Sequence, residues 1–494
     1  MQGIRFLLIL LVLIAGPAVA ADDPVQKALK AYEKHQYDAA ARDLRAALPS
    51  LAQGKQSSAR LALGMIYLKS AELHRGFAGT SLIVSTDYLK RLTMEGGKDR
   101  SRYCDLYLGL ANLEAGKADA ASAQLEKFLA GAANESRYAD IARIALGRAA
   151  SASGDKDKAR EIWGSVKATD LEVRSELAGT RSRAGMDEKS APSLCDEAVA
   201  DGKRTGRSLP IIAVKNCLGI YAKAGLVDRG FELLAQADLR SPSSRETIGK
   251  SKVIPFYDLQ LLQNLSAFFL QASIVSLEKA STDQQLNGIA NFFLGEAYLL
   301  AGNRDQAARA TAAFLSSSQV PPPYKSRALV RQAEIRHEIG RQADAIGVWD
   351  ELSRSQPGDP ELQGGILAAC GRLRIDCPRV VQTATLALER GEGRKFMALN
   401  AGLGRYYLGK KDYAKALTYL EAGRDKGNKN KVESNDPELL AALAEAYYRV
   451  KKFSEAQEIY FEMSKSFPAV RQIQEALQGI YSREQKSPGD VRIL

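Results

Sequence analysis

The stretch LAEAYYRVKKFSEAQEIYFEMSKSFP, from Leu443 to Pro468, contains two apolar stripes separated by a short polar turn. The same order of small, aromatic and charged residues returns in LGRYYLGKKDYAKALTYLEAG from Leu403, LGEAYLLAGNRDQAARATAAFL from Leu294 and LGLANLEAGKADAASAQLEKFL from Leu108. Apolar residues three and four positions apart form one face of a helix, so each stretch predicts two antiparallel helices joined by a turn. Because one such pair cannot bury its apolar face alone, the recurrence predicts a stack of pairs.

Each position of this recurring pattern, called the repeat frame below, has a physical role. Small residues such as Ala444 and Ala456 allow two helix backbones to approach closely, and aromatic residues fill the space beside that contact. Proline follows the second helix and sets the entry to the next pair. A glycine or a flexible polar residue ends the first helix, and the four quoted stretches place these turn residues at Gly116, Gly302, Lys411 and Lys451.

The frame resembles the tetratricopeptide repeat (TPR). Seven clear units fall at 102–135, 140–172, 212–240, 288–318, 326–358, 397–430 and 437–469. Degenerate units fill 22–95, 172–205, 246–282 and 360–392. The resemblance implies an all-α, right-handed superhelical solenoid of antiparallel helix pairs. We expect an N-terminal array over 21–245, a C-terminal array over 283–469, and a capping helix with a short tail over 470–494.

Two stretches depart from the frame. Residues 252–280 are apolar nearly all round a helix, which indicates burial on two sides. The segment 246–282 is therefore predicted as a joint between the two arrays, or alternatively as one long, well-covered degenerate repeat. Residues 70–96 stretch a repeat by several positions, which predicts either an exposed contact loop around His74–Thr80 or simple variation in loop length.

The first twenty residues predict an export signal. MQGIR carries one positive charge, FLLILLVLIAG is apolar, and the small residues Ala18 and Ala20 form a cleavage site before Ala21. The apolar run is short for a membrane span, although an uncleaved N-terminal anchor is the alternative. We therefore expect a signal peptide over 1–20, cleavage after Ala20, and a periplasmic mature chain without a transmembrane segment.

The chain is basic, with 69 lysines and arginines against 58 aspartates and glutamates and a net charge of +11. A basic surface attracts acidic polysaccharide, lipid phosphates or an acidic protein. The two signs are interspersed along the chain, and the densest basic run, Lys426–Lys431, is interpreted as a solvated loop. Nucleic acid is not an expected partner, because an exported protein seldom meets it.

The five cysteines allow two pairs in an oxidising compartment and leave at least one thiol free. Cys370 and Cys377 flank the turn GRLRID between two predicted helices, and Cys195 and Cys217 fall on neighbouring antiparallel helices. The alternative is that all five are small buried thiols at helix crossings.

The residues that enzymes need are not gathered into motifs. His35, His74 and His337 lie far apart and are interpreted as surface or groove histidines, so neither a metal nor a cofactor is predicted. The sequence contains no GxSxG, no P-loop and no dinucleotide-binding glycine fingerprint. The glycines of Gly402–Lys411 are interpreted as positions of the repeat. The protein is accordingly predicted not to be an enzyme.

The TPR resemblance also implies a binding surface. In that family the first helix of every pair lines a concave groove, and its inward positions contact the partner. Carried over to this chain, these positions are mixed in character, which suits an extended peptide or a helix. They are Tyr103, Leu106, Leu110, Leu113, Arg148, Phe292, Glu296, Leu299, Glu334, His337, Arg405, Glu445, Tyr448 and Arg449.

These features together predict a non-enzymatic periplasmic scaffold that binds protein partners of the cell envelope. Polysaccharide export, pilus or secretion machinery and outer-membrane assembly are the candidate settings. The alternative hypothesis is that the basic surface binds acidic polysaccharide or lipid phosphates.

Overall fold

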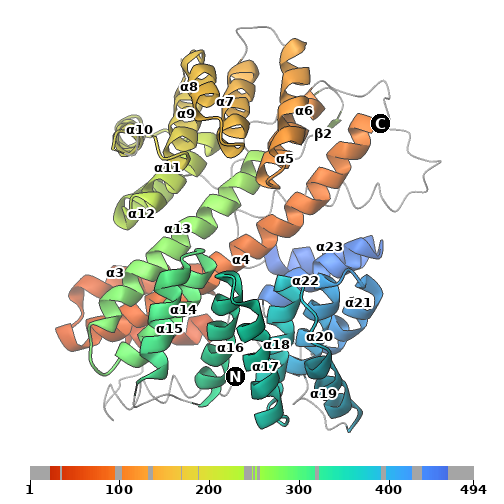
Figure 1. Ribbon diagram of the computed structural model, residues 1–494. Coiled ribbons are helices and arrows are strands. Elements are labelled where there is room, and N and C mark those ends of the chain that lie inside the picture. Colours follow the sequence, from red (N-terminus) through yellow and green to blue (C-terminus); the bar gives the residue numbers. More distant parts are fainter. Residues whose placement is uncertain are drawn as a thin grey trace. The chain divides into compact units, whose positions relative to one another are not determined.

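The chain folds into antiparallel helix pairs (Figure 1). The computed structural model describes residues 23–33, 36–94, 103–131, 137–168, 170–186, 189–237, 247–248, 251–252, 256–317, 322–390, 397–424 and 437–464. The predicted signal peptide over 1–20, the basic run Lys426–Lys431 and the predicted capping helix and tail over 470–494 lie outside these residues.

Ten helix pairs follow one another along the described chain. The N-terminal pair is α2 (Pro24–Glu33) with α3 (Tyr37–Ala47), followed by the short 3-10 helix η1 (Leu48–Ser50). The next four are α5 (Tyr103–Glu114) with α6 (Ala118–Ala130), α7 (Arg137–Ala152) with α8 (Lys156–Gly164), α9 (Leu171–Arg183) with α10 (Ala191–Thr205), and α11 (Ile211–Lys223) with α12 (Val227–Gln236). The last five are α14 (Asn287–Leu300) with α15 (Arg304–Leu315), α16 (Pro322–Glu338) with α17 (Gln342–Ser355), α18 (Pro360–Leu373) with α19 (Pro378–Glu389), α20 (Met397–Gly409) with α21 (Tyr413–Ala422), and α22 (Pro437–Arg449) with α23 (Phe453–Ser464).

Three elements stand outside this pairing. Two long helices, α4 (Gln53–Met94) and α13 (Phe256–Ser281), interrupt the series. A small antiparallel ladder joins β1 (Thr247–Ile248) to β2 (Ser251–Lys252), with Thr247 opposite Lys252. All other regular structure in the described residues is helical.

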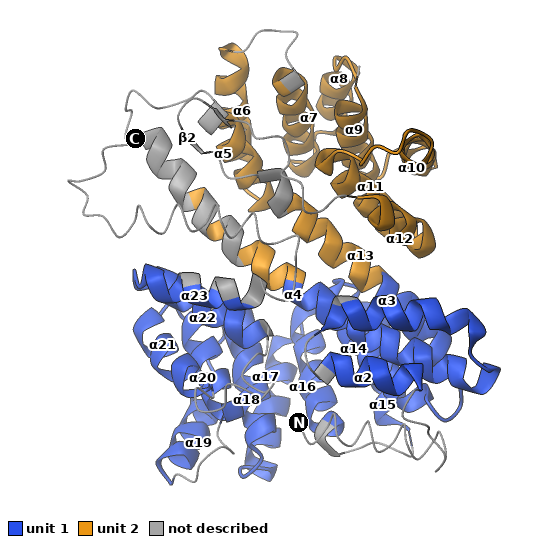
Figure 2. Cartoon of the chain, turned by 180° about the vertical axis from the view of Figure 1, so that it is seen from behind, with its two compact units in different colours: residues 1–73, 272–466 blue, residues 74–271, 467–494 orange. Residues whose placement is uncertain are grey.

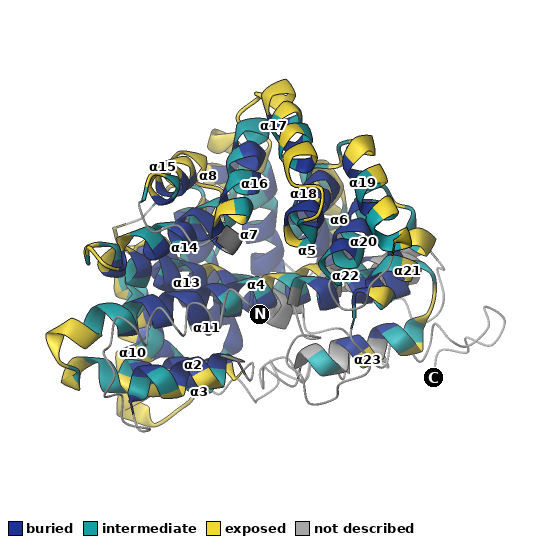
Figure 3. Cartoon of the chain, turned by 90° about the horizontal axis from the view of Figure 1, so that it is seen from below, coloured by how far each residue is buried: buried dark blue, intermediate teal, exposed yellow. Residues whose placement is uncertain are grey.

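The pairs are stacked in chain order. The first helices α5, α7, α9 and α11 pack successively on one another, and so do α14, α16, α18, α20 and α22. Figure 3 shows that first helices such as α14 and α18 are buried or half-buried along most of their length, whereas second helices such as α15 and α17 expose one side. This arrangement is an α-solenoid, and it confirms the predicted fold class.

The small residues of the frame stand at close helix contacts, as predicted. A Cβ atom on Gly147 would lie only 2.3 Å from Nε1 of Trp163 on the paired helix. The indole N–H of Trp163 donates to the carbonyl of Ile144 at 3.0 Å. The predicted turn residues Gly116, Gly302, Lys411 and Lys451 all adopt positive φ angles, which is the left-handed conformation that ends a helix.

The chain forms two compact units (Figure 2). Unit 1 comprises residues 1–73 and 272–466, and unit 2 comprises residues 74–271 and 467–494. The chain therefore leaves unit 1 within α4 and returns to it within α13. This division differs from the predicted arrays, 21–245 and 283–469, because α2, α3 and the first part of α4 pack with the C-terminal helices.

A helix pair of unit 1 is divided between α4 and α13. A Cβ on Gly64 of α4 would lie 2.5 Å from Cγ of Leu277 of α13. The hydroxyl of Ser273 donates to the carbonyl of Gly64 at 2.8 Å, although the two residues are 209 positions apart. The buried residues Ser273, Leu277 and Ala280 repeat the spacing of Ala121, Leu125 and Phe128 in α6. The first part of α4 and the last part of α13 thus form one repeat, into which residues 74–271 are inserted.

The divided repeat predicts an energetic coupling between Gly64 and Leu277. Gly64→Ala should destabilise unit 1 by about 1–3 kcal/mol, because the new methyl group collides with the Leu277 side chain. In the background of Leu277→Ala, the same change should cost much less, since the cavity accepts the methyl group. A double-mutant cycle in urea measures this coupling. Additive costs of the two substitutions would show that the residues do not pack together.

The predicted contact loop around His74–Thr80 is wrong. These residues lie within α4, and His74 is buried, with its ring stacked on Phe269 at a centroid distance of 5.4 Å. The described part of the stretched segment, from residue 70 to Met94, therefore belongs to a helix.

Glycines also allow α18 and α20 to approach unusually closely. A Cβ on Gly364 would lie 2.3 Å from the carbonyl oxygen of Ala398, and a Cβ on Gly409 would lie 2.1 Å from that of Gly371. The interpretation of the Gly402–Lys411 glycines as repeat positions holds for Gly404, whose neighbour is Leu420 of its paired helix. Gly402 and Gly409 also occupy packing positions, because they face α18 of the preceding pair.

Candidate functional site

Charged side chains from successive first helices gather into one cluster in each unit. The unit 2 cluster consists of Glu114, Arg148, Glu176, Arg183 and Lys215. The unit 1 cluster consists of Lys69, Glu72, Glu296, Arg327, Arg331, Glu334, Arg372, Arg405 and Glu438. These clusters are the candidate functional site, because they occupy the helices that the TPR resemblance assigns to partner binding.

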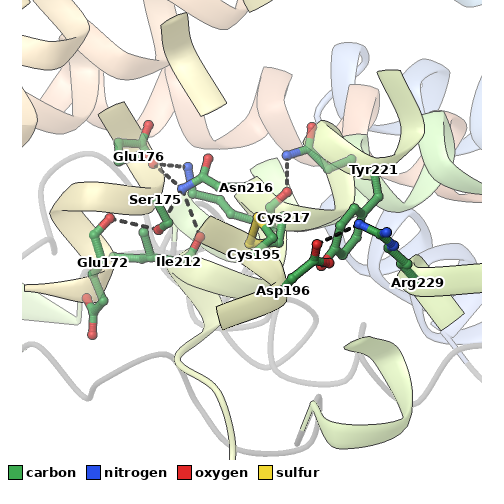
Figure 4. The surroundings of a disulfide bond; sticks show 12 residues. Glu172, Ser175, Glu176, Cys195, Asp196, Ile212, Asn216, Cys217, Tyr221 and Arg229 are labelled. Atoms are coloured by element: carbon green, nitrogen blue, oxygen red, sulfur yellow. Dashed lines mark hydrogen bonds and ion pairs between the residues drawn. A yellow bond between two sulfur atoms is a disulfide. The ribbon is translucent and has the colours of Figure 1, made fainter. Parts of the chain in front are cut away.

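A fully buried ion pair lies at the centre of the unit 2 cluster. The ammonium group of Lys215 on α11 donates to Glu176 on α9 at 2.5 Å, and to the Gln260 side chain on α13 at 2.6 Å. Asn216 also donates to Glu176, at 2.9 Å, and to the carbonyl of Ile212 (Figure 4). The carboxylate and the ammonium group therefore replace their lost water contacts with protein contacts.

A second pair joins this centre through Gln260. The guanidinium of Arg148 on α7 donates to Glu114 on α5 at 2.5 Å. The Gln260 amide donates to the same carboxylate at 2.9 Å, across 146 positions of sequence. The row of first helices from α5 to α11 is thus connected to α13 within unit 2.

The electrostatics of unit 2 follow from this pairing. Burial by itself would raise the pKa of Glu176, but the charges of Lys215 and Arg183 outweigh it and lower that pKa to about 2. Burial lowers the pKa of Lys215, and the charge of Glu176 only partly opposes this effect. Burial would likewise raise the pKa of Glu114, yet Arg148 brings it below its ordinary value. Both carboxylates are therefore held as anions.

The unit 1 cluster is a ladder of ion pairs between neighbouring repeats. Glu296 on α14 accepts from Arg327 at 2.7 Å and from Arg331 at 2.9 Å, both on α16. The ladder continues from α16 to α18 through Glu334 and Arg372, with two contacts of 2.9 Å. It extends from α20 to α22 through Arg405 and Glu438, 3.1 Å apart. Opposite charges thereby link α14 to α16, α16 to α18, and α20 to α22.

The unit 1 cluster contains a further ion pair, which lies on α4. Lys69 is ion-paired with Glu72 on the following turn of the same helix. The charges of both residues act on Glu438 and its neighbours. Burial and the nearby charge of Glu438 raise the pKa of Glu72, against the opposing influence of Lys69. A segment that lies far away in sequence therefore belongs to the charged row of the C-terminal helices.

The paired carboxylates predict a loss of stability in acid. Burial would raise the pKa of Glu296, but Arg327 and Arg331 lower it to about 2, against about 4.5 in the unfolded chain. Since the folded pKa is the lower one, the stabilisation is complete above about pH 4.5 and disappears as the pH falls toward about 2. Glu296→Gln should remove roughly 3 kcal/mol at neutral pH and weaken this pH dependence. Urea unfolding at several pH values measures both effects, with the exposed Glu351→Gln as the control.

Several predicted groove residues are core residues. Leu106, Leu110 and Leu113 are buried in unit 2, and Phe292 is buried in unit 1. Phe292 packs edge to face on Tyr324 with a centroid distance of 4.7 Å. The resemblance assigned these positions to the binding face, whereas the structure buries their apolar side chains.

The remaining predicted groove residues divide into two groups. Arg148, Glu296, Glu334 and Arg405 belong to the two charge clusters. The others do not belong to either charge cluster. Leu299 and His337 are half-buried, Tyr448 is buried against Phe453, Glu445 lies 3.6 Å from Arg449, Arg449 lies over the ring of Tyr413, and the side chain of Tyr103 is outside the described residues.

Sequence reasoning missed more than half of the residues in each charge cluster. Arg327, Arg331, Arg372, Glu438 and Lys215 were not among the predicted groove residues, yet each of them forms an ion pair with the preceding repeat. A signal was present in the sequence, because the paired acids and bases are separated by about one repeat length. The separations are 34 positions for Glu114 and Arg148, 35 for Glu296 and Arg331, and 38 for Glu334 and Arg372.

Two disulfides are present in the structure. Cys195 of α10 is joined to Cys217 of α11, with a Cα–Cα distance of 5.5 Å (Figure 4). Cys370 at the end of α18 is joined to Cys377 at the start of α19, with a Cα–Cα distance of 6.5 Å. Beside the first disulfide, Asp196 accepts from both Tyr221 and Arg229. The covalent and polar contacts together fix α10 against α11 and α12.

The two disulfides should differ in their effect on stability. Cys195–Cys217 closes a longer segment, with a sequence separation of 22 against 7 for Cys370–Cys377. Loop-closure entropy then predicts a loss of about 3 kcal/mol when Cys195 and Cys217 are both replaced by alanine, and about 1 kcal/mol less for the other pair. Chemical unfolding of the two double variants measures this order. An equal or reversed order would contradict the entropic argument.

Two further kinds of site are absent from the described residues. They contain no group of three or more His, Cys, Asp or Glu side chains that could hold a metal ion. No helix among them is long and apolar enough to cross a membrane. His74 is buried, contrary to the prediction of a surface or groove histidine, and His35 is outside the described residues.

Comparisons with known proteins give distant similarities to solved structures. No family model matches the chain, and no curated protein matches it. The chain is similar to a chain of the APC/C hetero-tetramer Cut9–Hcn1, with 14% identity, coverage of 95% of this chain and 97% of that one, and a TM-score of 0.28. It is also similar to the TPR domain of P58(IPK), with 16% identity, coverage of 77% of this chain and 98% of that one, and a TM-score of 0.19. Because these sequence identities and TM-scores are low, the assignment of an α-solenoid rests on the helix pairs and their packing.

Proposed function

We propose that this protein is a non-enzymatic scaffold that binds a protein partner in the bacterial cell envelope. The observation that carries the proposal is the row of successive first helices, which bears charged side chains at regular intervals in both units. Many of these side chains keep an accessible part; those of Arg327 and Glu438 are 46% and 40% exposed. A repeated, partly exposed row of both charge signs suits recognition of a peptide segment or helix.

Two further observations support an envelope location. The first twenty residues have the composition of an export signal. The two disulfides fit an oxidising compartment, because disulfides seldom persist in the cytosol of mesophiles. Polysaccharide export, secretion or pilus machinery and outer-membrane assembly are the settings in which such a scaffold would act.

The alternative, binding of acidic polysaccharide or lipid phosphates, is less well supported by the charge arrangement. A polyanion needs a surface on which basic charge clearly exceeds acidic charge. In each cluster, however, the basic groups exceed the acidic groups by only one. A polyanion would therefore meet buried carboxylates as well as guanidinium groups.

Crosslinking in the native host tests the proposal. The exported protein is purified from crosslinked cells, and recovered proteins are identified by mass spectrometry and then tested for direct equilibrium binding to the purified chain. A version without residues 1–20 serves as the control for location. We expect envelope proteins with the exported form only. Recovery of acidic glycan instead, released by moderate salt, would favour the alternative.

A further inference from the structure

Arg183 differs from every other basic residue of the two charge clusters. Arg148 and Lys215 in unit 2 each have a carboxylate oxygen within 4.0 Å, as do all the basic residues of the unit 1 cluster. Arg183 has none among the described residues. Its one hydrogen bond runs from Nη2 to the hydroxyl oxygen of Thr180 at 3.3 Å. Nε and Nη1 of its guanidinium donate no hydrogen bond there.

The surroundings of Arg183 are charged but leave it accessible. It is the last residue of α9, and its side chain is exposed to solvent. Crowding by protein atoms and repulsion from Arg148 lower its pKa, and the attraction of Glu176 and Glu114 does not compensate for them. Those two carboxylates already accept from Lys215 and Arg148. The cluster therefore carries one positive charge without a close partner.

We propose that Arg183 binds a single carboxylate from an aspartate or glutamate side chain of the partner protein. A guanidinium presents parallel N–H groups that match the two oxygens of a carboxylate, and such paired hydrogen bonds are the strong ones. A single carboxylate neutralises the excess charge of the unit 2 cluster. A chain of closely spaced anions would instead bring further negative charges toward Glu114 and Glu176. This inference rests on the proposed function and specifies the chemistry of the partner.

A minimal ligand tests the assignment without knowledge of the partner. The probe is N-acetylglutamate N-methylamide, which presents one glutamate side chain, and its glutamine counterpart is the neutral control. Both are titrated into the full-length exported protein labelled with ¹⁵N-arginine. The Nε–H signal of Arg183 is identified by its absence from the spectrum of Arg183→Gln.

The matched control variant is Arg174→Gln on the same helix. Arg174 is also exposed, but Glu197 lies 3.9 Å from its guanidinium, and it is not part of the cluster. We expect millimolar binding of the glutamate probe to the wild type and to Arg174→Gln, and at least about tenfold weaker binding to Arg183→Gln. Arg183→Lys should bind with intermediate affinity, because it keeps the charge but loses the paired donors.

Three results would overturn the assignment. The first is that the glutamate probe does not shift the Arg183 signal, and the second is that the glutamine probe shifts it equally. The third is that Arg183→Gln, with a normal circular dichroism spectrum, binds the glutamate probe with unchanged affinity. Preferential binding of polygalacturonate over the glutamate probe would also reject it and favour a polysaccharide. If crosslinking nevertheless recovers a partner that binds directly, the scaffold function stands and only the role of Arg183 is rejected.

Discussion

Replacing Gly364 or Gly371 by alanine is expected to destabilise unit 1 by about 3 kcal/mol or more. The reason is the backbone contact between α18 and α20. A Cβ on Gly364 would lie 2.3 Å from the carbonyl oxygen of Ala398, and a Cβ on Gly371 would lie 2.4 Å from that of Arg405. A flexible side chain can rotate away from an added methyl group, whereas a helix backbone can move only with its whole helix.

The adjacent residue Gly365 provides the control. A Cβ there would meet only Val330 Cγ2, at an ordinary contact distance of 3.9 Å. Gly365→Ala should therefore be neutral or should stabilise α18 by up to about 1 kcal/mol, because alanine is the better helix former. Hydrogen exchange of peptides from α18 and α20, measured by mass spectrometry, locates the effect. Equal protection in Gly364→Ala and Gly365→Ala would show that the two helices do not approach so closely.

Replacing Lys215 by methionine is expected to cost about 3–5 kcal/mol in unit 2. The Lys215 side chain is 0% exposed and its ion pair with Glu176 is buried. Removal of the ammonium group leaves the Glu176 carboxylate in a site of low dielectric with Asn216 as its remaining close donor. The cost is mainly the penalty of an uncompensated buried charge, because the methionine side chain is itself compatible with the core.

Two comparisons isolate this effect. The additional change Glu176→Gln should recover part of the loss, because it removes the unpaired charge. The exposed pair Lys203–Glu232, with a separation of 3.1 Å, is the control, and Lys203→Met should cost less than about 1 kcal/mol. Urea unfolding monitored by hydrogen exchange of α9 and α11 measures all three variants. Equal losses for Lys215→Met and Lys203→Met would contradict the buried-pair argument.

The charge ladders change how the predicted groove is interpreted. The resemblance assigned the inward residues of the first helices to a partner, yet many of them already have partners within the chain. Glu334, for example, accepts from both Arg331 and Arg372. A peptide that binds there must add to these ion pairs or displace them. Arg183 needs no such displacement, since no carboxylate oxygen of the described chain lies within 4.0 Å of it.

The sequence by itself determined the local architecture of this protein. The spacing of apolar, small and turn residues predicted the helix pairs, and Lys411 and Lys451 were recognised as turn residues although they are not glycines. Each of these features depends on residues within one repeat. Periodicity therefore suffices to predict them, because helix formation and close packing within a pair are set by neighbours a few turns away.

Only the tertiary structure decided which segments that are far apart in the sequence pack against one another. Gly64 meets Leu277, Gln260 meets Glu114, and Gly364 meets the backbone of α20. None of these partners is specified by local periodicity, since a glycine or a glutamine looks the same in the sequence whether its neighbour is solvent or another helix. The burial that gives an ion pair or a close backbone contact its energy arises only when the repeats are stacked.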